Sequence, residues 1–152
     1  MREAGQGDVS TLVGLMRDFY AESGYTLAEP QAAAAFETLL ARPELGRIWL
    51  VERDGEAAGY IVVTFVFAME HGGIAAIVDD FYVRPEARGE GLGRATLAAA
   101  RQACELLGAR AMRVDVGRDN SVAQAVYSSA GFETLPGHAL LQVSLAPPSH
   151  ET

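Results

Sequence analysis

The stretch that decides the fold is Val83-Arg84-Pro85-Glu86-Ala87-Arg88-Gly89-Glu90-Gly91-Leu92-Gly93-Arg94, near the middle of a chain of 152 residues. A largely apolar run, Ile74 to Val83, leads into it, and an alanine-rich run, Ala95 to Leu107, leads out of it. These runs predict a strand, a glycine-rich turn and a helix in that order. The first turn of a helix has amides without intrahelical acceptors and a partial positive charge, and glycines let the backbone approach a ligand. The stretch therefore predicts a turn that binds a diphosphate.

Two common phosphate motifs do not fit this stretch. The dinucleotide pattern G-x-G-x-x-G, counted from Gly89, needs a glycine at the position of Arg94. The ATP and GTP P-loop needs a Gly-Lys-Ser/Thr run, and the chain contains no lysine. What remains is Arg88-x-x-Gly91-x-Gly93 after a strand that ends in Val83-x-Pro85. This pattern resembles motif A of the GNAT superfamily, the acetyl-CoA-dependent N-acetyltransferases, in which backbone amides bind the pyrophosphate of coenzyme A.

A second pattern strengthens the resemblance. The run Asn120-Ser121-x-Ala123-x-x-x-Tyr127-x-x-x-Gly131-Phe132 resembles motif B of the same family, and one strand's length of chain separates it from motif A. Either pattern alone is suggestive, whereas the two in order are specific, and the resemblance covers nearly the whole chain. It implies acetyl-CoA as the cosubstrate and the amine of a small molecule, cationic in form, as the acceptor. Because the family is commonly dimeric, it also implies a homodimer.

Apolar periodicity predicts an α/β fold with the element order β-α-α-β-β-β-α-β-α-β-β. The resemblance implies a GNAT-type mixed, mostly antiparallel central sheet flanked by about four helices. After a short first strand, the remaining strands are expected at 48–53, 58–69, 74–83 and 111–116, with a closing pair at 132–135 and 139–145. We expect a single domain over residues 1–146 and a C-terminal tail over residues 147–152.

The cofactor site follows from motif A. Backbone amides from Gly89 to Arg94 are expected to do most of the pyrophosphate binding. Arg88 is the motif residue for a phosphate contact, whereas Arg94 either meets a phosphate or is a solvated surface arginine. The resemblance implies that the main chain of Phe81 and Val83 pairs with the pantetheine arm, and that Asn120 binds this arm, caps a helix, or does both. The complete predicted set is Phe81, Val83, Arg88, Gly89, Gly91, Leu92, Gly93, Arg94 and Asn120.

Acetyl transfer to an amine needs a neutral amine, a donor for the oxyanion and a proton for the leaving thiolate. Tyr127 is the predicted acid, since the resemblance implies that it faces the thioester sulfur; the alternative is a packed aromatic anchor. Asp79 and Asp80 interrupt an apolar strand, which costs desolvation energy. A bulge, frequent in this strand of the family, would re-aim one carboxylate. Asp79 is the first choice for the base and Asp80 the second; alternatively they bind an arginine or a partner subunit.

Charge and composition exclude several classes of function. The formal net charge of −8 argues against nucleic acid and against anionic membrane surfaces as partners. A single cysteine, Cys104, cannot form a disulfide within the chain, and no apolar segment follows Met1; both features predict a cytoplasmic protein. His71, His138 and His150 are far apart without ligand spacing, so no metal is expected.

Two other functions remain open at this stage. One is a protein N-terminal acetyltransferase, which loops too tight to admit a peptide would exclude. The other is a non-catalytic module that senses acyl-CoA. The tyrosine at position 127 and the acids at positions 79 and 80 weigh against the sensor.

Overall fold

The computed structural model describes residues 1–145. Within this range the chain forms five strands and four α-helices. The strands are β1 (Arg2–Glu3), β2 (Gly46–Arg53), β3 (Glu56–Ala68), β4 (Gly73–Val83) and β5 (Ala111–Val114). The helices are α1 (Val9–Glu22), α2 (Glu29–Ala41), α3 (Leu92–Leu106) and α4 (Ser121–Ser129). The expected tail at 147–152 lies outside the described residues.

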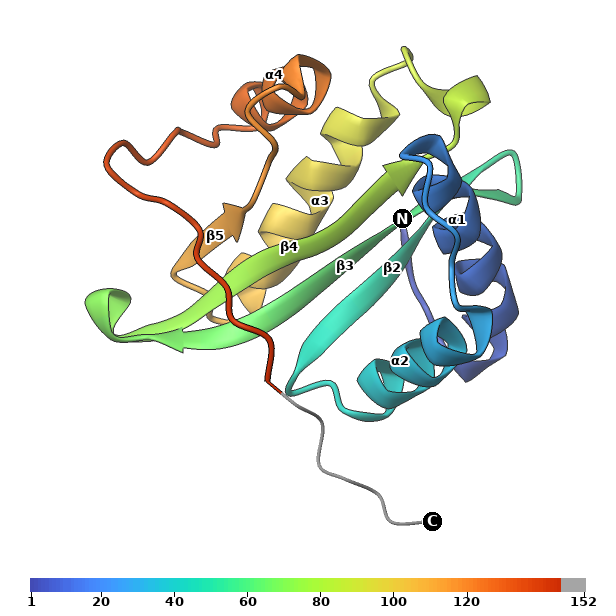
Figure 1. Cartoon of the computed structure of the whole chain (residues 1–152), viewed down its shortest axis with the longest axis horizontal. Helices are drawn as coiled ribbons and strands as arrows, with labels where there is room; N and C mark the ends of the chain where they lie inside the picture. Colours follow the sequence, from blue (N-terminus) through green and yellow to red (C-terminus); the bar gives the residue numbers. More distant parts are fainter. Residues whose placement is uncertain (146–152) are drawn as a thin grey trace.

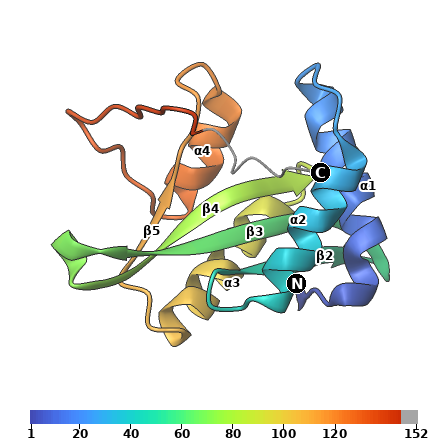
Figure 2. The same cartoon turned by 60° about the horizontal axis from the view of Figure 1, so that its bottom comes forward.

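The strands form one sheet in the order β1-β2-β3-β4-β5 (Figure 1). Neighbouring strands are antiparallel except β4 and β5, which are parallel. Helices α1 and α2 cover one face of the sheet and α3 covers the other (Figures 1 and 2). Helix α4 packs beside α3. The α/β class and the mixed, mostly antiparallel sheet predicted from the sequence are confirmed.

Side-chain alternation along β3 divides the hydrophobic core between the two faces of the sheet. Tyr60 and Val62 pack with α1 and α2, whereas Ile61 and Val63 pack on the opposite face with α3. All four side chains are buried, and burying one large apolar side chain contributes about 1.5–3 kcal/mol. The neighbouring strand β4 therefore lies in a sheet that is packed on both faces, and its carboxyl end is a rigid position for a site.

The pairing of β3 with β4 contains a bulge. Val62 pairs with Asp80 and Val63 pairs with Val78, so Asp79 is the extra residue without a partner. A bulge of this kind re-aims the side chains around it. The bulge expected in this strand is confirmed, and it separates the surroundings of the two aspartates.

The predicted closing pair of strands is wrong. Residues 132–145 contain no strand, and residues 133–145 are all exposed. The alternating apolar pattern of 139–145 is typical of a strand, but a strand forms only where another strand accepts its hydrogen bonds. Within residues 1–145 no strand lies beyond β5 to do so. The strand predicted at 111–116 is also shorter, since β5 ends at Val114.

Candidate active site

The predicted strand, turn and helix are present around the glycine-rich stretch. Strand β4 ends at Val83, a single helical turn spans Pro85–Ala87, and α3 begins at Leu92. Gly89 has φ 84° and Gly91, the N-cap of α3, has φ 78°. Side chains with a Cβ rarely adopt this left-handed conformation. The two glycines therefore allow the chain to reverse and enter the helix.

Six consecutive amides at this turn have no protein acceptor in the described chain. The last backbone amide before these six that donates a hydrogen bond is that of Arg88, which donates to the Pro85 carbonyl at 3.2 Å. The first one after them is that of Ala95, which donates to the Gly91 carbonyl at 3.0 Å. The amides of Gly89 to Arg94, which lie between them, are thus free to donate to a ligand at the positive end of a helix of 15 residues. This is the chemistry that a diphosphate requires.

Arg88 does not point toward these amides. Its Nε donates to the Val83 carbonyl at 2.8 Å, and its terminal nitrogen bonds both carboxylate oxygens of Glu22 at 2.8 Å. A second ion pair, Arg84 to Asp18 at 2.5 Å, joins the same turn to α1. Arg88 therefore ties the turn to the end of α1 in this structure. Arg94, by contrast, is exposed on the first turn of α3.

The main chain at the end of β4 has an open side. Pairing between β4 and β5 ends at Val78 and Val114, although β4 continues to Val83. The Arg84 amide donates to the Ala58 carbonyl of the β3 side at 2.7 Å. Because hydrogen-bonding direction alternates along an antiparallel strand, the main-chain groups of Phe81 and Val83 face away from β3, toward the gap left by β5. An extended ligand arm finds free partners there.

The two aspartates at the bulge lie in different surroundings. Asp79 is exposed, whereas Asp80 is partly buried and accepts a hydrogen bond from the Tyr60 hydroxyl at 2.9 Å. Burial raises the pKa of the Asp80 carboxyl to about 6; the Tyr60 hydrogen bond opposes this rise and the charge of Asp79 adds to it. Burial and the charge of Asp80 also raise the pKa of Tyr20. A partly buried carboxyl with a pKa near neutrality is suited to accepting a proton.

Tyr127 projects from α4 toward the end of β4. Its ring makes edge contacts with Phe81, at 6.4 Å between ring centroids, and with Phe132, at 5.3 Å. Burial and the negative charge of Asp80 raise the pKa of Tyr127 to about 12. The hydroxyl therefore keeps its proton at neutral pH, as a general acid must. The ring is also packed against Phe81 and Phe132, which agrees with the alternative prediction that Tyr127 is a packed aromatic anchor.

Asn120 is the N-cap of α4, where its Oδ1 accepts from the Ala123 amide at 3.1 Å. The predicted capping role is confirmed, and the side-chain Nδ2 makes no hydrogen bond to any other described residue. The Nδ2 of Asn120 is therefore a free donor at the N-terminus of α4. Gly131 follows the end of the same helix with φ 95°, a left-handed conformation that glycine commonly adopts there.

Two contacts of the site were not predicted from the sequence: Tyr60 donates a hydrogen bond to Asp80, and Glu22 forms an ion pair with Arg88. Tyr60 lies 20 positions before Asp80, and Glu22 lies 66 positions before Arg88. Neither pair has a local signal in the sequence. Only the β3–β4 register, shifted by the bulge, could have placed Tyr60 beside Asp80.

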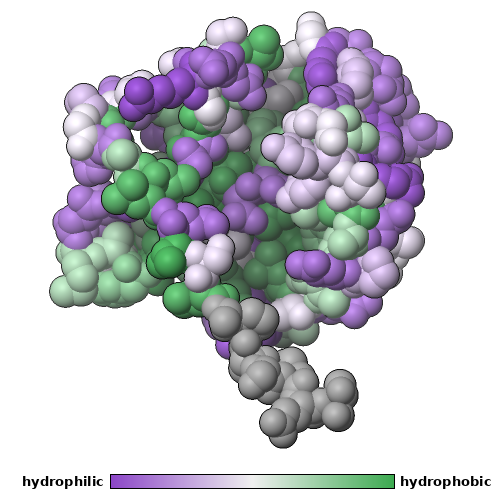
Figure 3. Space-filling model, viewed as in Figure 1, coloured by the Kyte–Doolittle hydropathy of each residue, from purple (hydrophilic) through white to green (hydrophobic). Residues whose placement is uncertain are grey.

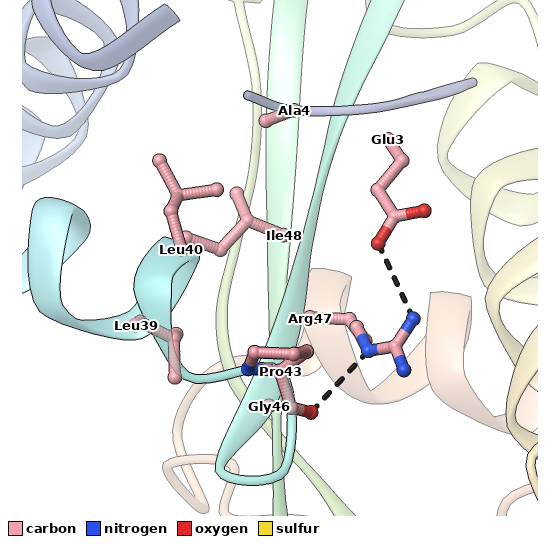
Figure 4. Close-up of a pocket in the computed structure, with 8 residues that line it drawn as sticks. All are labelled: Glu3, Ala4, Leu39, Leu40, Pro43, Gly46, Arg47 and Ile48. Atoms are coloured by element: carbon pink, nitrogen blue, oxygen red, sulfur yellow. Dashed lines mark hydrogen bonds and ion pairs between the residues drawn. The ribbon is translucent and has the colours of Figure 1, made fainter. Parts of the chain in front are cut away.

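Two small hollows in the described part of the chain lie away from this turn. One, of about 40 Å³, lies between β1, α2 and β2 and contains the Glu3–Arg47 ion pair at 3.3 Å (Figure 4). Another, of about 180 Å³, lies near Phe65, Ile74 and Leu107. The first is far too small for a nucleotide cofactor. Figure 3 shows instead an open hollow in the middle of the face that it views, with hydrophobic residues at its bottom.

Within residues 1–145, no group of three or more His, Cys, Asp or Glu side chains is placed to hold a metal ion. His71 instead lies beside Arg113 and Glu70 at the β3–β4 turn, and His150 is outside the described range. None of the helices in that range has the length and apolar character needed to cross a membrane.

Comparison with known proteins agrees with the geometry. Residues 12–132, most of the described chain, match the acetyltransferase (GNAT) family. The chain belongs to this family.

Individual proteins are similar to this chain over most of its length. The uncharacterized N-acetyltransferase YhfO of Bacillus subtilis (strain 168) is 26% identical over 136 residues, 88% of this chain and 89% of that protein. The integron cassette protein HFX_CASS3, from the mobile metagenome of Cole Harbour Salt Marsh, is 50% identical with a TM-score of 0.87, over 97% of this chain and 91% of that chain. AAC(6')-Iy, solved with the bisubstrate analog CoA-S-monomethyl-acetylneamine, is 18% identical with a TM-score of 0.81, over 95% of this chain and 97% of that chain.

Proposed function

We propose that this protein transfers the acetyl group of acetyl-CoA to the amine of a small, cationic molecule by direct attack in a ternary complex. The observation that carries the proposal is the row of six unpaired amides from Gly89 to Arg94, at the end of the strand that bears Asp80. Membership of the GNAT family supports the reaction class. The bisubstrate analog bound to AAC(6')-Iy joins coenzyme A to an amine-bearing small molecule on the same fold.

The amide row would hold the pyrophosphate, supported by the positive end of α3. The main-chain groups of Phe81 and the amide of Val83 would pair with the pantetheine amides, and Asn120 Nδ2 would donate to the same arm. Arg94 takes the phosphate-contacting role in this proposal. Arg88 positions the turn through Glu22 and the Val83 carbonyl, so its contribution to binding is indirect.

In the proposed reaction, Asp80 accepts a proton, directly or through water, from the acceptor ammonium. The neutral nitrogen then attacks the thioester carbon, and the C–S bond breaks as the C–N bond becomes an amide. Tyr127 donates its proton to the leaving sulfur and is reprotonated by the second proton that the nitrogen releases. Products are an acetamide and free coenzyme A, with one proton released through Asp80. Holding both substrates together supplies much of the rate increase.

Asp80 is preferred over Asp79 as the base, which reverses the order suggested by the sequence. Asp79 is exposed to solvent at the bulge. Asp80 is partly buried, oriented by Tyr60 and close enough to raise the pKa of Tyr127 through its charge. The acid and the base of the proposal therefore interact across one end of β4.

The pH dependence of the reaction is a first test. Because the pKa of Asp80 is about 6, kcat/KM is expected to rise about tenfold per pH unit below pH 6 and to level off above it. The rate profile should be measured with acceptors whose amine pKa values differ by at least about two units, so that the acceptor's ionisation can be separated from that of Asp80. An acidic limb that moves with the acceptor, and never stays near pH 6, would remove Asp80 from the mechanism.

Tyr127→Phe is expected to lower kcat by about 10–100-fold and to leave the dissociation constant of acetyl-CoA unchanged. The substitution removes only the hydroxyl, so the ring contacts with Phe81 and Phe132 remain. Thiol release measures turnover and calorimetry measures binding. Tyr25→Phe, which removes an exposed hydroxyl (the residue is 69% exposed), is the matched control. Equal turnover of Tyr127→Phe and wild type at every pH would exclude the tyrosine as the acid.

A panel of small amines, with thiol release from acetyl-CoA as readout, tests the function as a whole. Turnover with a cationic small amine supports the proposal. Turnover only with peptides that present a free N-terminus would favour the protein N-terminal acetyltransferase. Tight binding of acetyl-CoA without turnover of any amine or peptide would favour the acyl-CoA sensor.

A further inference from the structure

Two small residues of β3 lie opposite the end of β4. We call this pair, Ala58 and Gly59, the seat. Gly59 pairs with Val83, and a Cβ on Gly59 would lie 2.1 Å from the Tyr82 carbonyl oxygen and 3.0 Å from the Val83 Cα. A side-chain carbon does not approach a backbone oxygen this closely. Strands β3 and β4 therefore lie nearer to each other at Gly59 than any other residue type would allow.

The seat also contacts the turn that follows β4. Ala58, Val83 and Ala87 form a small cluster of buried side chains, and Leu92 of α3 packs against it. The Arg84 amide donates to the Ala58 carbonyl at 2.7 Å. Ala87 ends the single helical turn that precedes the amide row. Both the end of β4 and the start of the diphosphate turn therefore pack on the seat.

Strand β3 has a bulge at the seat. In the pairing of β3 with β2, Gly59 pairs with Val51 and Ala57 pairs with Glu52, so Ala58 is the extra residue without a partner. A bulge bends its strand and increases the local twist. The bend lies directly opposite the end of β4, where the glycine permits the close approach of the two strands.

The end of β4 has no other strand to fix its position. Beyond Val78, β4 pairs with β3 alone within residues 1–145, and Figure 1 shows the end of β4 well apart from β5. The other proposed contacts of the cofactor come from α4 and its N-cap, Tyr127 and Asn120. The distance between the two groups of contacts therefore depends on how closely β4 lies against β3 at the seat.

We propose that Ala58 and Gly59 are positioning residues for the cofactor: the lack of side-chain bulk at the seat aligns the end of β4 with α4, so that one coenzyme A molecule reaches both. This inference rests on the proposed function. Neither residue touches the ligand in the proposal. A displacement of about 1 Å within a site can cost about 100-fold in rate, so the close approach that a missing Cβ allows is large enough to matter.

Gly59→Ala tests the proposal through a comparison of two ligands. Adenosine diphosphate contains a diphosphate but no pantetheine arm, so its contacts with the amide row move together with the end of β4. Coenzyme A must also reach α4. Gly59→Ala is expected to raise the calorimetric dissociation constant of coenzyme A at least about tenfold and that of adenosine diphosphate less than about threefold. A general structural defect would weaken the binding of both ligands alike.

Gly46→Ala is the matched control. A Cβ on Gly46 would lie 2.3 Å from the Val63 carbonyl oxygen, at the other end of the β2–β3 pairing. This variant is expected to lose a similar amount of thermal stability and to bind both ligands like wild type. Ala58→Val enlarges the other residue of the seat. It should change the ratio of the two dissociation constants in the same direction, even if Gly59→Ala does not fold.

The Arg84 amide provides a measurement without ligand. Its hydrogen exchange in the free protein should be faster in Gly59→Ala than in wild type and unchanged in Gly46→Ala, because this amide is bonded to Ala58. Unchanged exchange in Gly59→Ala, or an unchanged ratio of the two dissociation constants, would overturn the role of the seat and leave the proposed function intact. A wild type that binds neither ligand would overturn the proposed function, and the role of the seat with it.

Discussion

Asp80→Asn is expected to lower kcat/KM by about 10²–10⁴-fold, the range measured when a general base is removed, and to make the protein more stable at pH 7. Asparagine keeps an oxygen that accepts from the Tyr60 hydroxyl, so the fold of the bulge is preserved. It cannot accept a proton from the acceptor amine. One substitution should therefore separate activity from stability.

The gain in stability follows from the direction of the pKa shift. The pKa of Asp80 rises from 3.8 to about 6 on folding, so the folded state binds more protons than the unfolded state between these values. The stabilising contribution of the neutral carboxyl is complete below pH 3.8 and is lost as pH rises through 6. One pKa unit corresponds to about 1.4 kcal/mol, and partial solvation of the carboxyl reduces the effect. Asp80→Asn should therefore raise the free energy of unfolding by about 2 kcal/mol at pH 7 and leave it unchanged at about pH 3.5.

Chemical denaturation at both pH values measures the stability difference, and thiol release measures activity. Asp79→Asn is the informative comparison, because it changes the neighbouring carboxylate at the exposed side of the bulge. We expect it to lose less than about tenfold in kcat/KM, within the range of a nearby solvated charge. If Asp79→Asn lost more activity than Asp80→Asn, the base would be Asp79, as first predicted from the sequence.

Gly91→Val is expected to weaken acetyl-CoA binding at least about 100-fold. Gly91 has φ 78°, and nothing lies within 4 Å of where its Cβ would be, so the effect arises from backbone conformation and not from a clash. A β-branched residue is strongly disfavoured at positive φ. The turn is expected to relax toward negative φ, and its amides would then no longer converge on one phosphate group.

Gly108→Val is the matched control, because Gly108 ends the same helix with φ 88° and open space around it. Both variants should lose similar thermal stability, whereas only Gly91→Val should lose affinity in calorimetric titration with acetyl-CoA. Equal affinities of the two variants would show that the conformation of the turn is not what binds the cofactor.

The parts of the structure that could be predicted from the sequence are those with local causes. Apolar runs on either side of a glycine-rich stretch specify a strand, a turn and a helix within the 34 residues from Gly73 to Leu106. The bulge in β4 was expected from the resemblance to the GNAT family, in which this strand often carries one, and not from the two carboxylates alone. Asn120 and Gly131 mark the two ends of α4 by capping chemistry alone.

The parts that could not be predicted depend on partners far along the chain. Arg88 is held by Glu22, and the hydrogen bond that leads us to propose Asp80 and not Asp79 as the base comes from Tyr60. Residues 139–145 show the opposite error: their alternating pattern is typical of a strand, but pattern alone does not provide the edge that a strand needs. A correct local pattern therefore predicted an element that the single chain does not form.

The central claim is that the main-chain amides from Gly89 to Arg94 bind the diphosphate of acetyl-CoA. Backbone amide resonances followed by NMR during titration with coenzyme A, and in parallel with pantetheine, which lacks the diphosphate, test it directly. We predict large downfield shifts of the Gly89, Gly91 and Gly93 amide protons with coenzyme A and none with pantetheine. Coenzyme A that binds while these amides keep their free-state positions would contradict the account.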